Sequence, residues 1–167
     1  MPDIFINPWV YAVSFRYWIA GLVRQSLKAD HINWYFKMIE NLDPKQAWAV
    51  LQNNPAAVLI DVRTAIEHSF VGHPPKAIHV AWKEFPGMQL NNAFVEQVKQ
   101  HAPDQSAPIL LLCRSGVRSV DAAKALEANG YSHLINILEG FEGPLDEHQH
   151  RGALGGWRFH GLPWQQS

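Results

Sequence analysis

The stretch spanning residues 108–130 constrains the fold most, because a buried strand there passes into a helix through one short loop. Four consecutive apolar residues, Ile109–Leu112, predict a strand covered on both faces. Apolar residues at helical spacing follow, namely Ala122, Ala123 and Leu126. Gly130 is a typical residue just after a helix end. Strand, loop and helix in this order are typical of α/β proteins.

The loop between this strand and this helix begins with Cys113, the only cysteine of the chain. Gly116 allows the backbone to curl, so that the N–H groups of residues 114–118 can face one point. These amides, the N-terminus of the following helix and two arginines would favour a thiolate over a thiol. We therefore predict that Cys113 is a reactive nucleophile held in a loop formed by Arg114, Ser115, Gly116, Val117 and Arg118. The alternative is a buried, inert cysteine at a strand end.

The rest of residues 39–167 alternates between apolar runs and amphipathic segments. Further strands are expected over residues 57–60, 77–82 and 134–138. One helix is expected to begin at Asp43, with Gln46 completing a capping box, and to end at residues 53–55. A second is expected to be capped by Asn91 or Asn92 and to end at Pro103. This alternation predicts an α/β fold with a parallel sheet covered by helices on both faces.

Polar residues directly follow the run 57–60, at the sheet edge where open α/β folds bind ligands. We expect Asp61 and Arg63 to form an ion pair that holds the strand end rather than to react. Thr64 and Glu67 can form a capping box, although Glu67 can instead pair with Arg63. Together with Ser119, these residues are expected to support the site around the cysteine.

Composition excludes some classes of function. The net charge is −1, so there is no broad basic field of the kind that nucleic-acid binding needs. A single cysteine cannot form an internal disulfide, and a free reactive thiol is best preserved in a reducing compartment. We therefore expect a cytoplasmic protein without a nucleic-acid partner, and a peripheral membrane location is the alternative.

Residues 1–38 differ from the rest in being rich in aromatic side chains. Asn7 and Pro8 predict the start of a helix that extends to about Leu27. A secretory signal is not expected, because the chain opens with Asp3, and Arg16 disfavours a membrane span. The remaining interpretations are a helix that packs on its own domain or a dimer partner, and a helix at a membrane surface. We expect an N-terminal extension over 1–38 that mediates self-association or peripheral membrane contact, followed by a domain over 39–167.

Four separated motifs give the chain a resemblance to a single rhodanese domain: DVRTAIEHSFVGH, AIHVAW, LLLCRSGVRS and GGWRFHGLPW. Their order and spacing are similar to those of the family, and they extend over about residues 39–167. The resemblance implies a five-stranded α/β fold and transfer of sulfane sulfur through a persulfide on Cys113, with thiosulfate as the usual test donor. It implies no cofactor and no metal. Because the chain has no second cysteine, the acceptor thiol or protein must be external.

The chain departs from the family pattern after Gly140, where residues 141–154 are inserted before the Gly-Gly-Trp segment. The insertion can alter access to Cys113. Its acidic and histidine residues make a metal site conceivable, but no regular ligand spacing supports one, and a solvated loop is expected. These residues are Asp146, Glu147, His148 and His150.

Two other functions remain open at the level of sequence. Related folds in phosphatases and arsenate reductases hold an oxyanion in a loop of cysteine, five residues and arginine, which would place arginine where this chain has Ser119. The shorter loop here suits sulfur better than a phosphoryl group. The third possibility is a non-catalytic module that binds an anion or a partner protein, against which the intact Cys113 argues.

Overall fold

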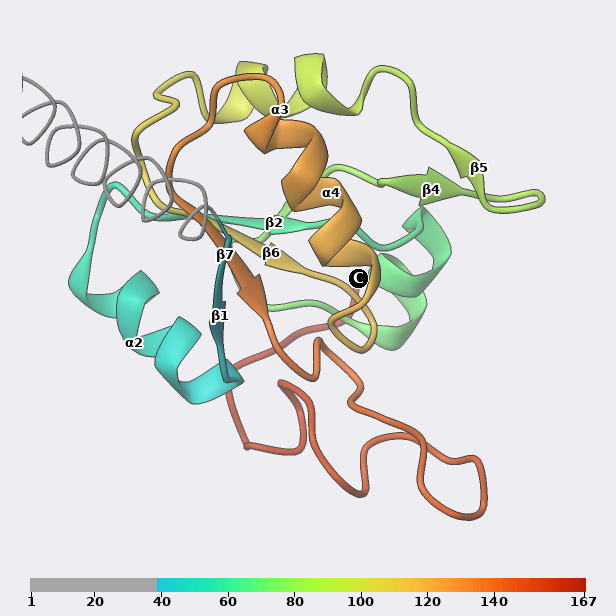
Figure 1. The fold of residues 1–167 in the computed structure, drawn as a ribbon. Coiled ribbons are helices and arrows are strands. Elements are labelled where there is room, and N and C mark those ends of the chain that lie inside the picture. Colours follow the sequence, from blue (N-terminus) through green and yellow to red (C-terminus); the bar gives the residue numbers. More distant parts are fainter. Residues whose placement is uncertain (1–38) are drawn as a thin grey trace, which may run out of the picture. The chain divides into compact units, whose positions relative to one another are not determined.

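The computed structural model describes residues 39–167, which form an α/β unit around a five-stranded sheet with the strand order β1-β7-β6-β2-β3 (Figure 1). All four pairings between neighbouring strands of this sheet are parallel. The strands are β1 (Ile39–Leu42), β2 (Val58–Asp61), β3 (Ile78–His79), β6 (Ile109–Leu112) and β7 (Leu134–Ile137). The predicted α/β class and parallel sheet are confirmed.

Three α-helices in the described part of the chain cover the sheet: α2 (Pro44–Asn53), α3 (Phe94–His101) and α4 (Arg118–Glu127). The start of α2 is as predicted, because Gln46 N donates to Asp43 Oδ1 over 2.9 Å and Asp43 N donates to Gln46 Oε1 over 3.1 Å. The predicted cap of α3 is wrong. That helix follows Ala93 without a side-chain cap, and Asn91 Oδ1 instead accepts from Ala93 N in the preceding turn.

Smaller elements lie between the strands and helices. A π-helical turn, Glu67–Val71, follows β2, and an antiparallel hairpin is formed by β4 (Lys83–Glu84) and β5 (Gln89–Leu90). The strand expected over 77–82 is shorter than predicted, since only Ile78 and His79 pair with β2. Strand β1 was not predicted, because its sequence IENL lacks a continuous apolar run and lies partly exposed at the sheet edge.

Strand β6 explains why helices lie on both faces of the sheet. All four of its residues are fully buried, and successive side chains point to opposite faces. Ile109 and Leu111 pack with residues of α3 and α4, whereas Leu110 and Leu112 pack on the other face, which α2 covers (Figure 1). Such a strand can only be stable between two apolar layers.

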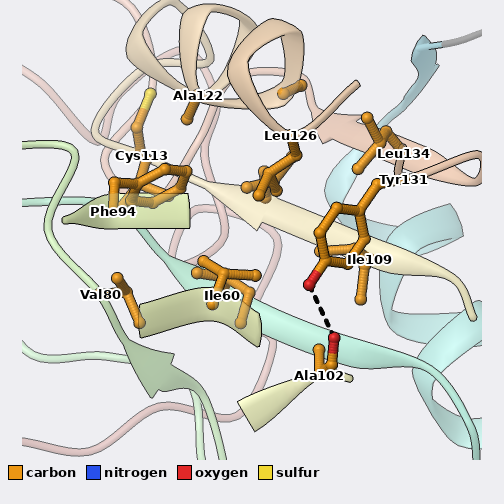
Figure 2. Packing of buried hydrophobic residues seen from close by; sticks show 14 residues of the cluster. Ile60, Val80, Phe94, Ala102, Ile109, Cys113, Ala122, Leu126, Tyr131 and Leu134 are labelled. Carbon is orange, nitrogen blue, oxygen red and sulfur yellow. Dashed lines mark hydrogen bonds between the residues drawn. The ribbon is translucent and has the colours of Figure 1, made fainter. Parts of the chain in front are cut away.

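The core on the α3 and α4 face extends up to the cysteine (Figure 2). At its far end, the Tyr131 hydroxyl donates a hydrogen bond of 2.8 Å to the carbonyl oxygen of Ala102. Cys113 belongs to the same cluster, beside Phe94, and its sulfur points toward the helix that carries Ala122 (Figure 2). The cysteine is therefore anchored by close packing on one side.

The helix expected over residues 7–27 and the extension 1–38 lie outside the described residues. Within 39–167, no helix is long and apolar enough to cross a membrane.

Candidate active site

The candidate site lies at the carboxyl ends of β2 and β6, which are neighbours in the sheet. Asp61 is in register with Leu112, and Cys113 follows directly. Five residues later the chain enters α4 at Arg118, so the helix N-terminus opens beside the sulfur. The cysteine is 1% exposed and forms part of the lining of a cavity of about 560 Å³. The strand–loop–helix unit predicted from sequence thus places the thiol where α/β folds bind ligands.

Two hydrogen-bond donors approach the sulfur. Gly116 N lies 3.1 Å and Ser119 Oγ lies 3.3 Å from Cys113 Sγ. Gly116 has a φ of 84°, and a Cβ at this position would lie 3.2 Å from the backbone of Ile137 and Glu139, so glycine fits here and larger residues are strained. Convergence of all five amides of residues 114–118 was expected, but within this loop only that of Gly116 forms a hydrogen bond to Sγ.

Ser119 is fully buried and links the sulfur to the sheet. Its Oγ lies 2.6 Å from Asn136 Oδ1, and Asn136 Nδ2 donates to Asn41 Oδ1 over 2.9 Å. A hydroxyl carries one proton, so Ser119 donates either to the sulfur or to Asn136 at any moment. The shorter contact favours Asn136 while the sulfur is a thiol, and a thiolate would compete for the same proton. Asn136 was missed from sequence, although a lone polar residue in the buried strand LINI was a usable signal.

Arg118 is tied to the scaffold by Glu67. Its NH1 and NH2 donate to Glu67 Oε2 and Oε1 over 2.8 and 2.6 Å, and both side chains are 16% exposed. Thr64 N and Oγ1 also donate to Glu67 Oε2, which confirms the predicted capping box. The suggested pairing of Glu67 with Arg63 is wrong, because Arg118 occupies the carboxylate.

The contact between Glu67 and Arg118 favours the charged form of both side chains. Burial by itself raises the pKa of Glu67, but hydrogen bonds from Arg118 and Thr64 outweigh burial and hold that pKa below its ordinary value. Burial by itself lowers the pKa of Arg118, but the hydrogen bonds and charge of Glu67 raise it above its ordinary value. The pair therefore remains ionised, and the charge of Arg118 is largely neutralised where it faces the cavity.

The predicted ion pair of Asp61 and Arg63 is present, and both side chains are fully buried. Arg63 Nε donates to Asp61 Oδ1 over 2.9 Å and NH2 donates to Oδ2 over 2.6 Å. Burial raises the pKa of Asp61, but hydrogen bonds from His68 and Arg63 outweigh it and lower that pKa to about 2. The guanidinium also lies 4.2 Å from the ring centroid of Phe141 and donates to the carbonyl oxygen of Gly72. The pair holds the end of β2 and does not line the cavity.

The cavity has one wall that the sequence did not reveal. Phe85 and Met88 come from the turn between β4 and β5 and line the cavity together with residues of the cysteine loop. Val117 completes the apolar lining, and Phe85 and Val117 are 54% and 70% exposed. The remaining lining residues are Glu67, Cys113, Arg114, Ser115 and Arg118. The sequence showed the turn at Pro86 and Gly87 only as a break between elements.

The segment that follows β7, residues 140–142, contacts the backbone of the loop that begins at Cys113. Phe141 N donates to Cys113 O over 2.8 Å, and Glu142 N donates to Arg114 O over 2.9 Å. Gly140 has a φ of 61°, and a Cβ on it would lie 2.6 Å from the carbonyl carbon of Arg114. The N–H groups of this segment thus hold the loop in place by hydrogen bonds to the carbonyl groups of Cys113 and Arg114.

One part of the insertion predicted over 141–154 therefore packs within the domain, and the other part forms an outer loop. The fully buried Phe141 belongs to the core, and Gly143 packs closely against Gly155, where the chain returns. In the outer part, Asp146 Oδ1 accepts from the amides of His148 and His150. No residue between 144 and 154 lines the cavity around Cys113.

Comparison with known proteins agrees with this geometry. The model of the rhodanese-like domain matches residues 43–145. The chain belongs to the rhodanese-like domain family. An uncharacterized protein of Rickettsia conorii is 36% identical over 133 residues, which cover 76% of this chain and 98% of the relative. The thiosulfate sulfurtransferase GlpE of Haemophilus influenzae is 28% identical over 104 residues, covering 62% of this chain and 86% of the relative. The family and these relatives support a protein of sulfurtransferase type.

Solved structures show the same fold. The crystal structure of Rv0390 from M. tuberculosis has a TM-score of 0.68 and 39% identity, and the match covers 77% of this chain and 98% of that chain. A polysulfide-sulfur transferase homodimer from Wolinella succinogenes has a TM-score of 0.55 at 23% identity, with 86% of this chain and 90% of that chain covered. The second likeness concerns the fold alone.

Proposed function

We propose that this protein is a sulfurtransferase that carries sulfane sulfur as a persulfide on Cys113, from thiosulfate or a persulfide donor to an external thiophilic acceptor. The observation that carries the proposal is the position of the thiol. It lies in the lining of a cavity, at the N-terminus of α4, with Gly116 N and Ser119 Oγ within hydrogen-bonding distance of Sγ. Donors in these positions can stabilise negative charge on the thiolate and on the persulfide.

With thiosulfate, the transfer has a simple electron balance. The Cys113 thiolate attacks the outer sulfur of the donor and forms a new S–S bond with its own electron pair. The original S–S bond breaks, and its electron pair leaves with sulfite. The product is an anionic persulfide on Cys113, and no proton, oxidant or reductant is needed.

The second half of the reaction requires an acceptor from outside the chain. Cys113 is the only cysteine, so no second thiol in the same chain can attack the persulfide. Cyanide, a small thiol or a protein thiol would take the outer sulfur and return Cys113 to the thiolate. The name of the Haemophilus relatives, thiosulfate sulfurtransferase, supports thiosulfate as a donor to test first.

The site favours this chemistry over phosphoryl or arsenate chemistry. The position that would hold the oxyanion-binding arginine is Ser119, which is fully buried and has no positive charge. The arginine one residue earlier, Arg118, is already paired with Glu67. A purely binding module would have no use for the two donors directed at the sulfur, which supports catalysis over binding alone.

The test is covalent uptake of sulfur. After incubation with thiosulfate, the intact mass should increase by one sulfur atom and should return to its starting value with dithiothreitol. Cys113→Ser should take up no sulfur and form no thiocyanate from cyanide, because a hydroxyl is a far weaker nucleophile at neutral pH. Unchanged thiocyanate formation by this variant would refute the proposal.

A further inference from the structure

A chain of three polar side chains extends from the sulfur of Cys113 to the edge of the sheet. Ser119 Oγ lies 3.3 Å from Cys113 Sγ and 2.6 Å from Asn136 Oδ1. Asn136 Nδ2 donates to Asn41 Oδ1 over 2.9 Å, and the two asparagines are partners in the register of β7 and β1 (Figure 1). Ser119 and Asn136 are buried, whereas Asn41 is exposed on the edge strand. The chain therefore begins at the buried thiol and ends in water.

Each member of this chain can both donate and accept a hydrogen bond. A hydroxyl has one proton and two lone pairs, and rotation of a carboxamide exchanges its acceptor oxygen with its NH₂ group. Within residues 39–167, no other side-chain hydrogen bond holds the amide of Asn136 or that of Asn41. The chain can therefore be satisfied in two directions. In one, Ser119 donates to Asn136, which donates to Asn41; in the other, every bond is reversed and Ser119 donates to the sulfur.

The two directions suit two charge states of the sulfur. A thiol has a weak S–H donor of its own, which Ser119 Oγ can accept while the hydroxyl proton points to Asn136. A thiolate or a persulfide anion can only accept, and the reversed chain offers it the hydroxyl proton. On ionisation the thiol proton leaves to solvent through the cavity, and no proton moves along the chain. Only the hydroxyl and the two amides rotate.

We propose that Asn136 and Asn41 are positioning residues that allow the hydroxyl of Ser119 to follow the charge on Cys113. An apolar residue in place of Asn136 would offer Ser119 no partner, and a carboxylate would only accept from it. The inference rests on the proposed sulfurtransferase function and adds residues from β7 and β1 to the same site. The other charged groups near the sulfur stay the same in every variant below: Glu67, Arg114 and Arg118 in the cavity lining and the ion pair of Asp61 and Arg63 at the end of β2.

The experiment fixes the direction of the chain from its exposed end. In Asn41→Asp the new carboxylate only accepts, so Asn136 must keep Nδ2 toward it and Oδ1 toward Ser119. Alkylation of the full chain by iodoacetamide is followed by intact mass as a function of pH, and it reports the thiolate of the only cysteine. The pH midpoint of alkylation should rise by about one unit, because the thiolate loses one hydrogen bond. Sulfur uptake from thiosulfate below this midpoint should fall about tenfold.

Asn41→Ala is the matched control. Water can both donate and accept at this exposed position, so both directions of the chain remain available and the midpoint should equal that of the wild type. Ser119→Ala removes the hydroxyl and should itself raise the midpoint. Adding Asn41→Asp to Ser119→Ala should then cause no further rise, because the chain no longer reaches the sulfur.

An unchanged midpoint in Asn41→Asp would overturn the inference. So would a rise that persists in the Ser119→Ala background, because the new charge would then act on the sulfur through space. If Ser119→Ala does not fold, salt makes the same distinction, since the effect of an exposed charge is screened and a fixed hydrogen-bond direction is not. If the wild type takes up no sulfur from any sulfane-sulfur donor, the proposed function fails, while the alkylation profiles still test the hydrogen-bond chain.

Discussion

Replacing Glu67 by glutamine tests how the cysteine loop is held at the start of α4. The carboxylate accepts two hydrogen bonds from Arg118 at 2.8 and 2.6 Å and two more from Thr64. The Glu67→Gln side chain would keep one acceptor oxygen but would place an NH₂ group against a guanidinium that has only donors. The variant therefore leaves Arg118, which is 16% exposed, without its counter-charge.

The expected loss in the free energy of unfolding lies between two limits. Exposed ion pairs contribute about 0.2–1 kcal/mol, and breaking a fully buried pair costs about 3–5 kcal/mol. With both side chains mostly buried and the contact bidentate, we expect a loss of about 2 kcal/mol. For a domain of this size, that loss corresponds to a decrease in Tm of about 6–10 °C. Because Arg118 follows the loop directly, sulfur uptake by Cys113 should also decrease, by about tenfold in kcat/KM.

The matched control is Glu96→Gln, which breaks the pair of Glu96 and Lys99 on α3. That pair has a single contact of 2.8 Å, and its side chains are 71% and 38% exposed. Breaking this pair should lower the free energy of unfolding by less than about 0.5 kcal/mol and should not affect sulfur uptake. Thermal unfolding and urea titration of both variants give the comparison. Equal Tm values for the two variants would show that Glu67 does not anchor the loop.

Three further predictions concern other parts of the chain. Because the folded pKa of Asp61 is about 2 and its ordinary value is 3.8, its stabilising contribution of about 2 kcal/mol is complete above about pH 4 and is lost as pH falls through about 2. Asp61→Asn should therefore be less stable than the wild type at neutral pH, and its free energy of unfolding in urea should change less between about pH 4 and about pH 2. A pH dependence parallel to that of the wild type would contradict this. Arg114→Ala should raise the KM for thiosulfate severalfold at unchanged Tm, while the exposed control Lys124→Ala should change neither quantity. If Arg114→Ala also lowered the Tm to a matching degree, Arg114 would be a structural residue. A chain that begins at Ile39 should retain sulfur uptake but lose self-association or liposome binding, measured by sedimentation and flotation. Failure of this chain to fold would refute the interaction hypothesis.

Local sequence patterns were sufficient for the elements that are buried on both faces or capped by their own residues. The run Ile109–Leu112 is apolar at every position, and the structure has a strand over the same residues. The capping box of Asp43 and Gln46 is formed by groups three residues apart, so it needs no tertiary contact. Strand β1 and the shortened strand β3 were not predicted well, because both lie at edges of the sheet, where the apolar pattern is weak.

The sequence by itself determined the α/β class and the position of Cys113 between a buried strand and a helix, because both follow from short-range patterns of apolar residues and glycine. The tertiary structure alone decided which partner Arg118 has, since Glu67 lies 51 residues away along the chain. It also decided that Asn136 supports Ser119 and that Phe85 lines the same cavity as Cys113. Such contacts depend on strand order and loop packing, which bring distant residues together, and local propensity carries no information about them.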